Sequence, residues 1–256
     1  MNRAQLRDRF DMTGRVVLVT GGTQGIGRAL AEGYVCANAK VAVVSRNPAH
    51  CKEAEQHLRE LGGEAIGFVA DVGHTDDIAR VIERTVDEFG GLDVLVNNAG
   101  TSGKQRVGSF TVEEWQRIFD MNVKVPVFLL QEAIPHLKKS GHGAVLNILT
   151  IAAFLNSREF PMYGSSKAAL FAHTRAAAAE LAQYGIRVNG LVPGSFETAL
   201  LRSQVDDTAR VGQMTMLKRV GHPDEAVGPA LLLTSEAGSF VTGQVLIVDG
   251  GHVIAR

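Results

Sequence analysis

A tyrosine and a lysine four residues apart are the side chains in this sequence best suited to acid–base chemistry. Tyr163 and Lys167 lie in the Ala-rich segment Met162–Tyr184, whose composition favours a helix. Residues four apart share one face of a helix, so the phenol and the ammonium are expected to project side by side. A free tyrosine has a pKa of about 10, and a neighbouring cation would lower that pKa toward neutrality. The pair is a candidate acid/base, and two surface side chains without a function are the alternative.

A glycine-rich turn near the start of the chain has the composition of a phosphate-binding loop. The apolar run Val16–Thr20 leads directly into it, and a helical segment, Arg28–Cys36, follows it. Glycines let the backbone turn sharply and approach a pyrophosphate, whose charge is met by free N–H groups at a helix N-terminus. A tight turn without a ligand is the alternative, but the position after a first strand favours a nucleotide. We expect the turn to bind a dinucleotide through Gly21, Thr23, Gln24, Gly25, Ile26 and Gly27.

The end of the second apolar run indicates which nicotinamide dinucleotide is preferred. About 20 positions beyond the glycine turn, dinucleotide-binding units that use NAD have an acidic residue that binds the ribose hydroxyls. Units that use NADP have a cationic residue that binds the 2′-phosphate. That count reaches Ser45, and Arg46 follows. A serine does not repel a phosphate, and a guanidinium can bind two of its oxygens. Unless Arg46 is an ordinary exposed charge, the pair predicts NADP(H) in preference to NAD(H).

Seven short apolar runs, separated by helical segments, must position these residues. The runs are apolar almost without alternation, as in a parallel sheet that is buried on both faces. They are Arg15–Thr20, Lys40–Ser45, Ala65–Ala70, Val94–Asn97, Ala144–Leu149, Arg187–Val192 and Val245–Val248. Among the helices between them, one is expected from Thr75 to Phe89 and another starts at Thr111. The predicted fold class is α/β, with a doubly wound, seven-stranded parallel sheet of Rossmann type in three layers.

One domain is expected over residues 1–256, because layered α/β folds often exceed about 200 residues without dividing. No repeat or linker interrupts the chain. The least regular stretch, at about residues 196–220, mixes polar residues with Met214, Met216 and Leu217. We expect this stretch to be a flexible lid over the substrate rather than a second domain.

Composition and charge exclude several other classes of protein. The net charge of −1 provides no field for holding nucleic acid, and two cysteines without a C-x-x-C pair indicate no disulfide framework. The eight histidines form no ligand cluster, so no metal is expected and a zinc alcohol dehydrogenase is disfavoured. A serine hydrolase would need a G-x-S-x-G motif, and the sequence contains none. Without a signal peptide or a long apolar run, the chain is expected to be cytoplasmic, with no membrane span.

A series of motifs, in order along about residues 10 to 251, resembles the short-chain dehydrogenase/reductase family. The turn reads TGGTQGIG, Asp71 follows the third strand, and NNAG, residues 97–100, closes the fourth. Residues 163–167 match Y-x-x-x-K, residues 193–198 match P-G-x-x-x-T, and VTGQ, residues 241–244, precedes the last strand. Besides the glycine turn, Ser45 and Arg46, the resemblance implies cofactor contacts at Asp71, Val72, Asn98, Ala99, Gly100, Tyr163, Lys167, Pro193, Gly194 and Thr198.

The resemblance also implies roles at the reacting end of the site. The lysine would hold the nicotinamide ribose, and Asn122, in the segment FDMNVKVP, would support a proton relay. In the family, a serine 13 residues before the tyrosine commonly binds the substrate oxygen. In this sequence that position holds Thr150. Threonine keeps the hydroxyl donor and adds a methyl group that restricts χ1. We expect hydride transfer between nicotinamide and a ketone or secondary alcohol, with Tyr163 as general acid/base.

The substrate side is implied only by family geometry, and each of its residues could equally be core or interface. Those residues are Thr101, Ser102, Ile151, Phe154, Met162, Phe196, Leu200 and Met214. An apolar ketone or alcohol is favoured over a sugar or an anionic acyl carrier, although Arg158 argues against this. A 3-oxoacyl thioester (acyl carrier protein) reductase is an alternative, and a dinucleotide-binding regulator is the non-enzyme alternative. The resemblance also implies a homo-oligomer, a tetramer, built through the helices that follow the fourth and fifth strands and through the C-terminal region.

Overall fold

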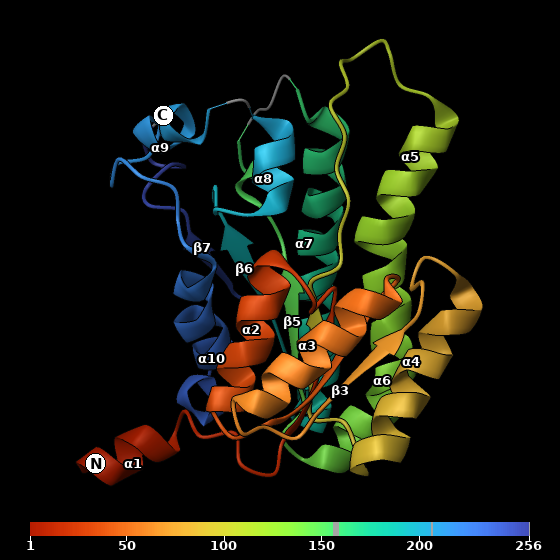
Figure 1. Cartoon of the computed structure of the whole chain (residues 1–256), viewed down its shortest axis with the longest axis vertical. Helices are drawn as coiled ribbons and strands as arrows, with labels where there is room; N and C mark the ends of the chain where they lie inside the picture. The colour runs from red at the N-terminus through yellow and green to blue at the C-terminus, as the bar shows by residue number, and fades with distance from the viewer. Residues whose placement is uncertain (156–158, 206, 256) are drawn as a thin grey trace.

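A seven-stranded parallel sheet organises the part of the chain that the computed structural model describes, residues 1–155, 159–205 and 207–255. Its strand order is β3-β2-β1-β4-β5-β6-β7, so the chain runs outward from the centre twice, in opposite directions (Figure 1). The strands are β1 (Val16–Thr20), β2 (Lys40–Ser45), β3 (Ala65–Val69), β4 (Val94–Asn97), β5 (Ala144–Ile148), β6 (Arg187–Pro193) and β7 (Val245–Val248). The predicted doubly wound parallel sheet is confirmed.

Helices cover both faces of the sheet, which explains why its strands are apolar without alternation. In β1, Val17 and Val19 belong to one buried cluster and Leu18 to the other, and all three are fully buried. The first cluster is completed by α2 (Gly25–Cys36), α3 (Pro48–Glu60) and α10 (Val227–Thr234). The second is completed by α4 (Thr75–Phe89), α6 (Val125–Ser140) and α7 (Pro161–Leu181). The layers are therefore helix, sheet and helix, as expected.

The helix that follows the glycine turn begins earlier than the sequence indicated. The expected start was Arg28, but α2 begins at Gly25, so Gly25, Ile26 and Gly27 form its first turn. The glycines that suggested a loop therefore carry N–H groups at a helix N-terminus, which have no partner within the helix. Later in the chain, the segment expected over Met162–Tyr184 forms α7 and then a short 3-10 turn, Ala182–Tyr184.

Thr111 starts a helix, as expected, but that helix is not regular throughout. The Thr111 hydroxyl accepts a hydrogen bond from the Glu114 N–H and caps α5 (Val112–Phe119). A single π-helical turn, Asp120–Lys124, then leads into α6. Such turns occur frequently at functional sites. This turn contains Asn122, one of the residues predicted for catalysis.

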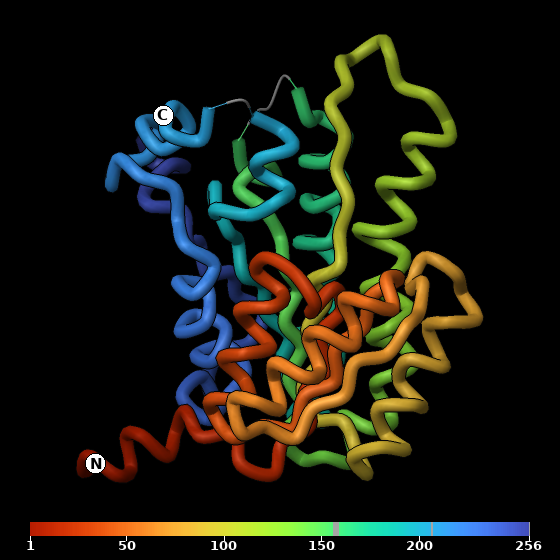
Figure 2. Tube along the Cα trace, viewed as in Figure 1, coloured from red at the N-terminus to blue at the C-terminus, as the bar shows by residue number. Residues whose placement is uncertain are grey.

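The irregular stretch predicted at residues 196–220 holds two short helices in its described part, α8 (Ala199–Gln204) and α9 (Thr208–Gln213). Thr198 caps α8 through a hydrogen bond from the Leu201 N–H. Both helices lie at the same end of the molecule as the loops that leave β4 and β5, as the tube shows (Figure 2). Across residues 1–155, 159–205 and 207–255, no helix has the length and apolar character needed to cross a membrane. α1 (Arg3–Asp8) has no buried residue and extends away from the sheet (Figure 1).

Candidate active site

A cavity of about 1060 Å³ lies at the carboxyl ends of the strands and brings most of the predicted site together. All the residues predicted to contact the cofactor line it, from the glycine turn to Thr198. It also contains Thr150 and, from the predicted substrate side, Thr101, Ile151, Phe196, Leu200 and Met214. Ligands of doubly wound sheets bind in this position, outside the strand ends where the strand order reverses.

The glycine turn has the shape of a close-fitting phosphate cradle. Gly21 and Gly25 have φ values of +63° and +54°, which side chains rarely adopt. At Gly27, an added Cβ would lie 2.3 Å from the Gly21 carbonyl oxygen and from the Asn98 amide nitrogen. The Asn98 amide nitrogen donates to the Thr20 and Gly21 carbonyls, at 2.9 and 3.1 Å, and so ties the turn to the end of β4. These residues fit a dinucleotide pyrophosphate, which needs an open backbone surface and free N–H groups.

The end of β2, next to the glycine turn, holds the residues predicted for the adenosine end. Ser45 ends β2, and the exposed Arg46 follows it. The Arg46 guanidinium has a carboxylate oxygen of Asp71 4.0 Å away, too far for a hydrogen bond. Asp71 is held in place because its Oδ1 accepts from the Gly73 N–H and its own N–H donates to Asp77. A cation and an acid are therefore both presented to a bound adenosine.

Lys167 lies deep in the reacting end of the cavity, where only 3 % of its surface is exposed. Its ammonium donates to the Ile148 carbonyl at 2.7 Å, at the end of β5. Burial disfavours the charged form and lowers the pKa of Lys167 to about 8. A Cβ added to Gly100 would lie 3.5 Å from the Lys167 ammonium and 3.3 Å from the Asn122 carbonyl oxygen. Gly100 therefore leaves room for these two side chains to approach the cavity.

Asn122 supports this end of the site from behind the cavity wall, because it is fully buried and does not line the cavity. Its carbonyl oxygen accepts from the Thr101 N–H, and its amide donates to the Thr101 carbonyl and to the Ser166 hydroxyl. The π-helical turn thus joins the loop after β4 to α7. The relay role predicted for Asn122 stays a prediction, and the structure gives it a positioning role.

Tyr163 and Thr150 meet where α7 passes the loop after β5. Gly164 permits the approach, because an added Cβ there would lie 2.5 Å from the Ala152 carbonyl oxygen. The side chains of Tyr163 and Thr150 both line this part of the cavity, and the Thr150 hydroxyl accepts a hydrogen bond from the Ala152 N–H at 3.3 Å. Burial raises the pKa of Tyr163, and the polar side chain of Thr150 opposes that shift. The expectation of a lowered pKa was therefore wrong, because desolvation of the phenolate outweighs its neighbours.

Three residues predicted for the substrate side lie outside the cavity wall. Met162 is buried in the packing of α7, and the ring of Phe154 packs against that of Phe171 at 5.4 Å. The Ser102 hydroxyl accepts from the Gln204 amide at 2.5 Å. Arg158 lies outside the described residues. Sequence analysis missed several residues of the wall that have no motif of their own: Arg117, Met121, Leu155, Glu159, Phe160, Gln204, Val205, Val211 and His252.

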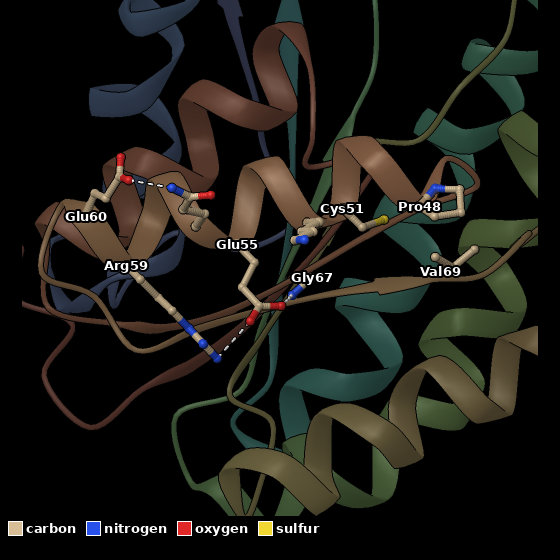
Figure 3. A pocket seen from close by; sticks show the side chains of 9 residues that line it. Pro48, Cys51, Glu55, Arg59, Glu60, Gly67 and Val69 are labelled. Carbon is tan, nitrogen blue, oxygen red and sulfur yellow. Dashed lines mark hydrogen bonds and ion pairs between the residues drawn. The ribbon is translucent and has the colours of Figure 1, made fainter.

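A second cavity, of about 510 Å³, lies between α3 and the edge strand β3 and lacks a comparable set of groups. Figure 3 shows that its polar side chains are turned toward each other. Glu55 pairs with Arg59 at 2.9 Å and accepts from the Gly67 N–H, and Gln56 donates to Glu60. Among the described residues, no group of three or more His, Cys, Asp or Glu side chains could hold a metal ion.

Comparison with known proteins identifies the family. The profile of the short chain dehydrogenases matches residues 15–209, which is most of the chain. The chain belongs to the short-chain dehydrogenase/reductase family. It is therefore an oxidoreductase that acts on CH–OH or C=O groups, and the family binds a nicotinamide dinucleotide. The alternative of a regulator without enzymatic activity is not supported.

Relatives within this family match over nearly the whole chain. The 5-keto-D-gluconate 5-reductase of Escherichia coli is 34% identical over 254 residues, covering 98% of this chain and 100% of its own. Glucose 1-dehydrogenase 2 of Bacillus subtilis is 33% identical over 252 residues, which cover 95% of this chain and 96% of the relative. A gluconate 5-dehydrogenase from Burkholderia cenocepacia, crystallised with NADP and tartrate, superposes with a TM-score of 0.93 at 34% identity. The superposition covers 98% of this chain and 100% of the other.

Proposed function

We propose that this short-chain dehydrogenase/reductase interconverts a ketone and a secondary alcohol with NADP(H), using Tyr163 as the acid/base. The observation that carries the proposal is that one cavity is lined by Tyr163, Thr150, Lys167 and the glycine turn. A panel of ketones with NADPH, followed by loss of absorbance of the reduced nicotinamide, tests it. No turnover of any ketone or alcohol by folded protein would contradict it.

The described residues can carry out each part of this chemistry other than hydride transfer. A nicotinamide dinucleotide, when bound, donates or accepts the hydride. Thr150 donates a hydrogen bond to the carbonyl oxygen and holds it beside the phenol. Tyr163 gives its proton to the oxygen as negative charge develops there, and its raised pKa keeps it protonated at neutral pH. We expect the Lys167 ammonium, which lines the same cavity four residues along α7, to stabilise the resulting phenolate.

Arg46 should determine the preference for NADP(H). We expect an Arg46→Ala variant to bind NADPH about tenfold or more weakly, since it loses charge-assisted hydrogen bonds to the 2′-phosphate. Its affinity for NADH should change little. Titration of both nucleotides into the purified protein measures this, with Lys52→Ala as the control, a cation of α3 that lines the second cavity. Equal loss of both nucleotides would contradict the assignment.

Thr150 should be replaceable by serine without loss of activity. Thr150 lines the same cavity as Tyr163, and a Thr150→Ser variant keeps the hydroxyl donor and gains rotational freedom. We expect kcat for ketone reduction to stay within about threefold of the wild-type value, whereas Thr150→Val, which keeps the shape and lacks the hydroxyl, should lose about a hundredfold. Steady-state kinetics with NADPH compares the three proteins. Abolished activity in a folded serine variant would overturn the role of Thr150.

We also propose that residues 196–220 act as a lid over the substrate. A hydrogen bond joins this segment to the loop after β4, because the Gln204 amide donates to the Ser102 hydroxyl. Thr198 also lies close to Gly25, since a Cβ added to that glycine would be 3.2 Å from the Thr198 methyl group. Leu200, Gln204 and Met214 line the cavity from this side. The segment therefore has both the position and the anchoring points of a cover.

A homotetramer is proposed for the assembly. Exposed apolar side chains on α5 and α6, among them Val112, Trp115 and Phe128, support it, as does the fully exposed Phe240 before β7. Sedimentation equilibrium gives the molar mass directly. The alternative of an acyl carrier protein reductase is not favoured, because the relatives named above are described as enzymes of sugars and sugar acids.

A further inference from the structure

A histidine stands directly behind the glycine turn. The side-chain amide nitrogen of Gln24, which lines the cavity, lies 3.1 Å from Nδ1 of His50 on α3. This contact spans the gap between the N-terminus of α2 and the first turn of α3. The motifs of the family give His50 no role, and it does not line the cavity itself. It is a titratable side chain separated from the cavity by one amide group.

The same gap is bounded on its other side by Arg46. Asn47 follows Arg46, caps α3, and accepts hydrogen bonds from the N–H groups of Ala49 and His50. This cap fixes the path of the backbone between Arg46 and His50. Arg46, Gln24 and His50 therefore surround one corner of the cavity, at the end where the adenosine ribose is expected.

We propose that His50, when protonated, is a second cation for the 2′-phosphate of NADP(H) and makes the preference for this cofactor dependent on pH. The proposal rests on the proposed NADP(H) function and adds a specificity-determining residue to it. Histidine is the side chain that most commonly changes charge near neutral pH, and it becomes positively charged when it binds a second proton. The added charge favours the phosphorylated nucleotide and leaves the affinity for the unphosphorylated one unchanged.

The charges around His50 leave it free to respond to a phosphate. α2, which packs against α3, presents Arg28 and Glu32. Arg28 is paired with Glu32 at 2.9 Å and with Glu53 of α3 at 3.1 Å. His57 of α3 lies 2.9 Å from Glu32. This cluster therefore holds one guanidinium and two carboxylates, and its cation is already engaged by both carboxylates.

The remaining charges are those of Lys52 on α3 and of Arg46, which lies near Asp71. Because Arg28 is paired and Lys52 lines the second cavity, the cations left in the described part of the chain for a phosphate at this corner of the first cavity are Arg46 and a protonated His50. No carboxylate among the described residues lies within 4.0 Å of the His50 ring, so no fixed anion there competes with a phosphate.

The contact with Gln24 is compatible with both charge states of the histidine. A neutral ring can accept from the amide N–H₂ at Nδ1. A protonated ring donates there instead, and a rotated amide can accept with its oxygen. In that second arrangement, the amide N–H₂ group is directed away from the histidine and is available to a phosphate oxygen. Protonation of His50 would therefore add a charge and re-orient a donor at the same corner.

The test uses two nucleotides that differ only in the 2′-phosphate, adenosine 2′,5′-bisphosphate and 5′-AMP. Each is titrated calorimetrically into the full chain at about pH 6 and about pH 8. The proteins are the wild type, His50→Gln, which keeps a neutral hydrogen-bonding side chain, and His50→Lys, which keeps a cation at both pH values. The phosphate itself titrates with a pKa of about 6, but this affects all three proteins equally.

Relative to His50→Gln, the wild type should bind the bisphosphate about fivefold more tightly at the lower pH and within about twofold at the higher pH. His50→Lys should keep the tighter binding at both. Affinity for 5′-AMP should be the same in all three, which also shows that the variants are folded. If His50→Gln matches the wild type at both pH values, the role of His50 is wrong.

The same experiment separates failure of the inference from failure of the proposed function. If the wild type does not distinguish the bisphosphate from 5′-AMP, the NADP(H) preference itself is wrong. The wild type and His50→Gln could instead both prefer the bisphosphate to 5′-AMP equally, while Arg46→Ala loses this preference. In that case only the inference about His50 fails.

Discussion

Replacing Tyr163 with phenylalanine is expected to reduce kcat for ketone reduction by about a thousandfold, while NADPH binds with nearly unchanged affinity. The loss follows from removal of the only phenol at the reacting end of the cavity within the described residues. General acid catalysis contributes about a hundredfold to ten-thousandfold to such reactions. The ring is expected to keep its place on α7, because the substitution removes only the hydroxyl group. Steady-state kinetics and nucleotide titration together measure both parts.

The pH dependence gives a second readout of the same residue. Because burial raises the pKa of Tyr163, the protonated phenol needed for reduction persists through neutral pH. Alcohol oxidation needs the phenolate, so its rate should rise as pH increases above neutrality. Tyr184→Phe makes the same chemical change at an exposed site beyond the end of α7 and should alter neither reaction. Substantial activity in Tyr163→Phe would assign the proton transfer to another group.

The strands could be predicted because their signal is local. A run such as Lys40–Ser45 is apolar throughout, and only a sheet covered on both faces buries such a run. The start of α2 was misplaced because glycine disfavours helices in isolation. Gly27 nevertheless lies in the first turn of α2. A glycine is needed there because any larger residue would collide with Gly21 and Asn98. Tertiary packing therefore decided a boundary that propensity could not.

At the site, motifs identified the residues but not how the environment changes them. The spacing of Tyr163 and Lys167 correctly placed them on one helix, yet spacing carries no information on burial, which sets the direction of both pKa shifts. Gln204 and His50 could not be found from sequence. Each is linked to the site by a contact with a residue distant along the chain, Ser102 for Gln204 and Gln24 for His50, and neither belongs to a motif.

Replacing Lys167 with methionine is expected to lower kcat by at least about a hundredfold, because the site loses a preorganised cation beside the phenol. Methionine is similar in length and apolar, so the buried position can accept it. Lys139→Met, at an exposed position near the end of α6, is the matched control and should retain full activity. An active Lys167→Met enzyme would show that the ammonium has no part in proton transfer.

The same variant should also change how stability depends on pH. The folded-state pKa of Lys167 is about 8, below the ordinary value of 10.5, so the unfolded chain binds more protons between these two pH values. The free energy of unfolding of the wild type should therefore rise with pH in this range, relative to Lys167→Met. Between about pH 7 and about pH 9.5 the relative gain should be about 2 kcal/mol. Urea unfolding of both proteins at the two pH values measures it, and parallel pH profiles would show that the buried ammonium is not destabilised by its surroundings.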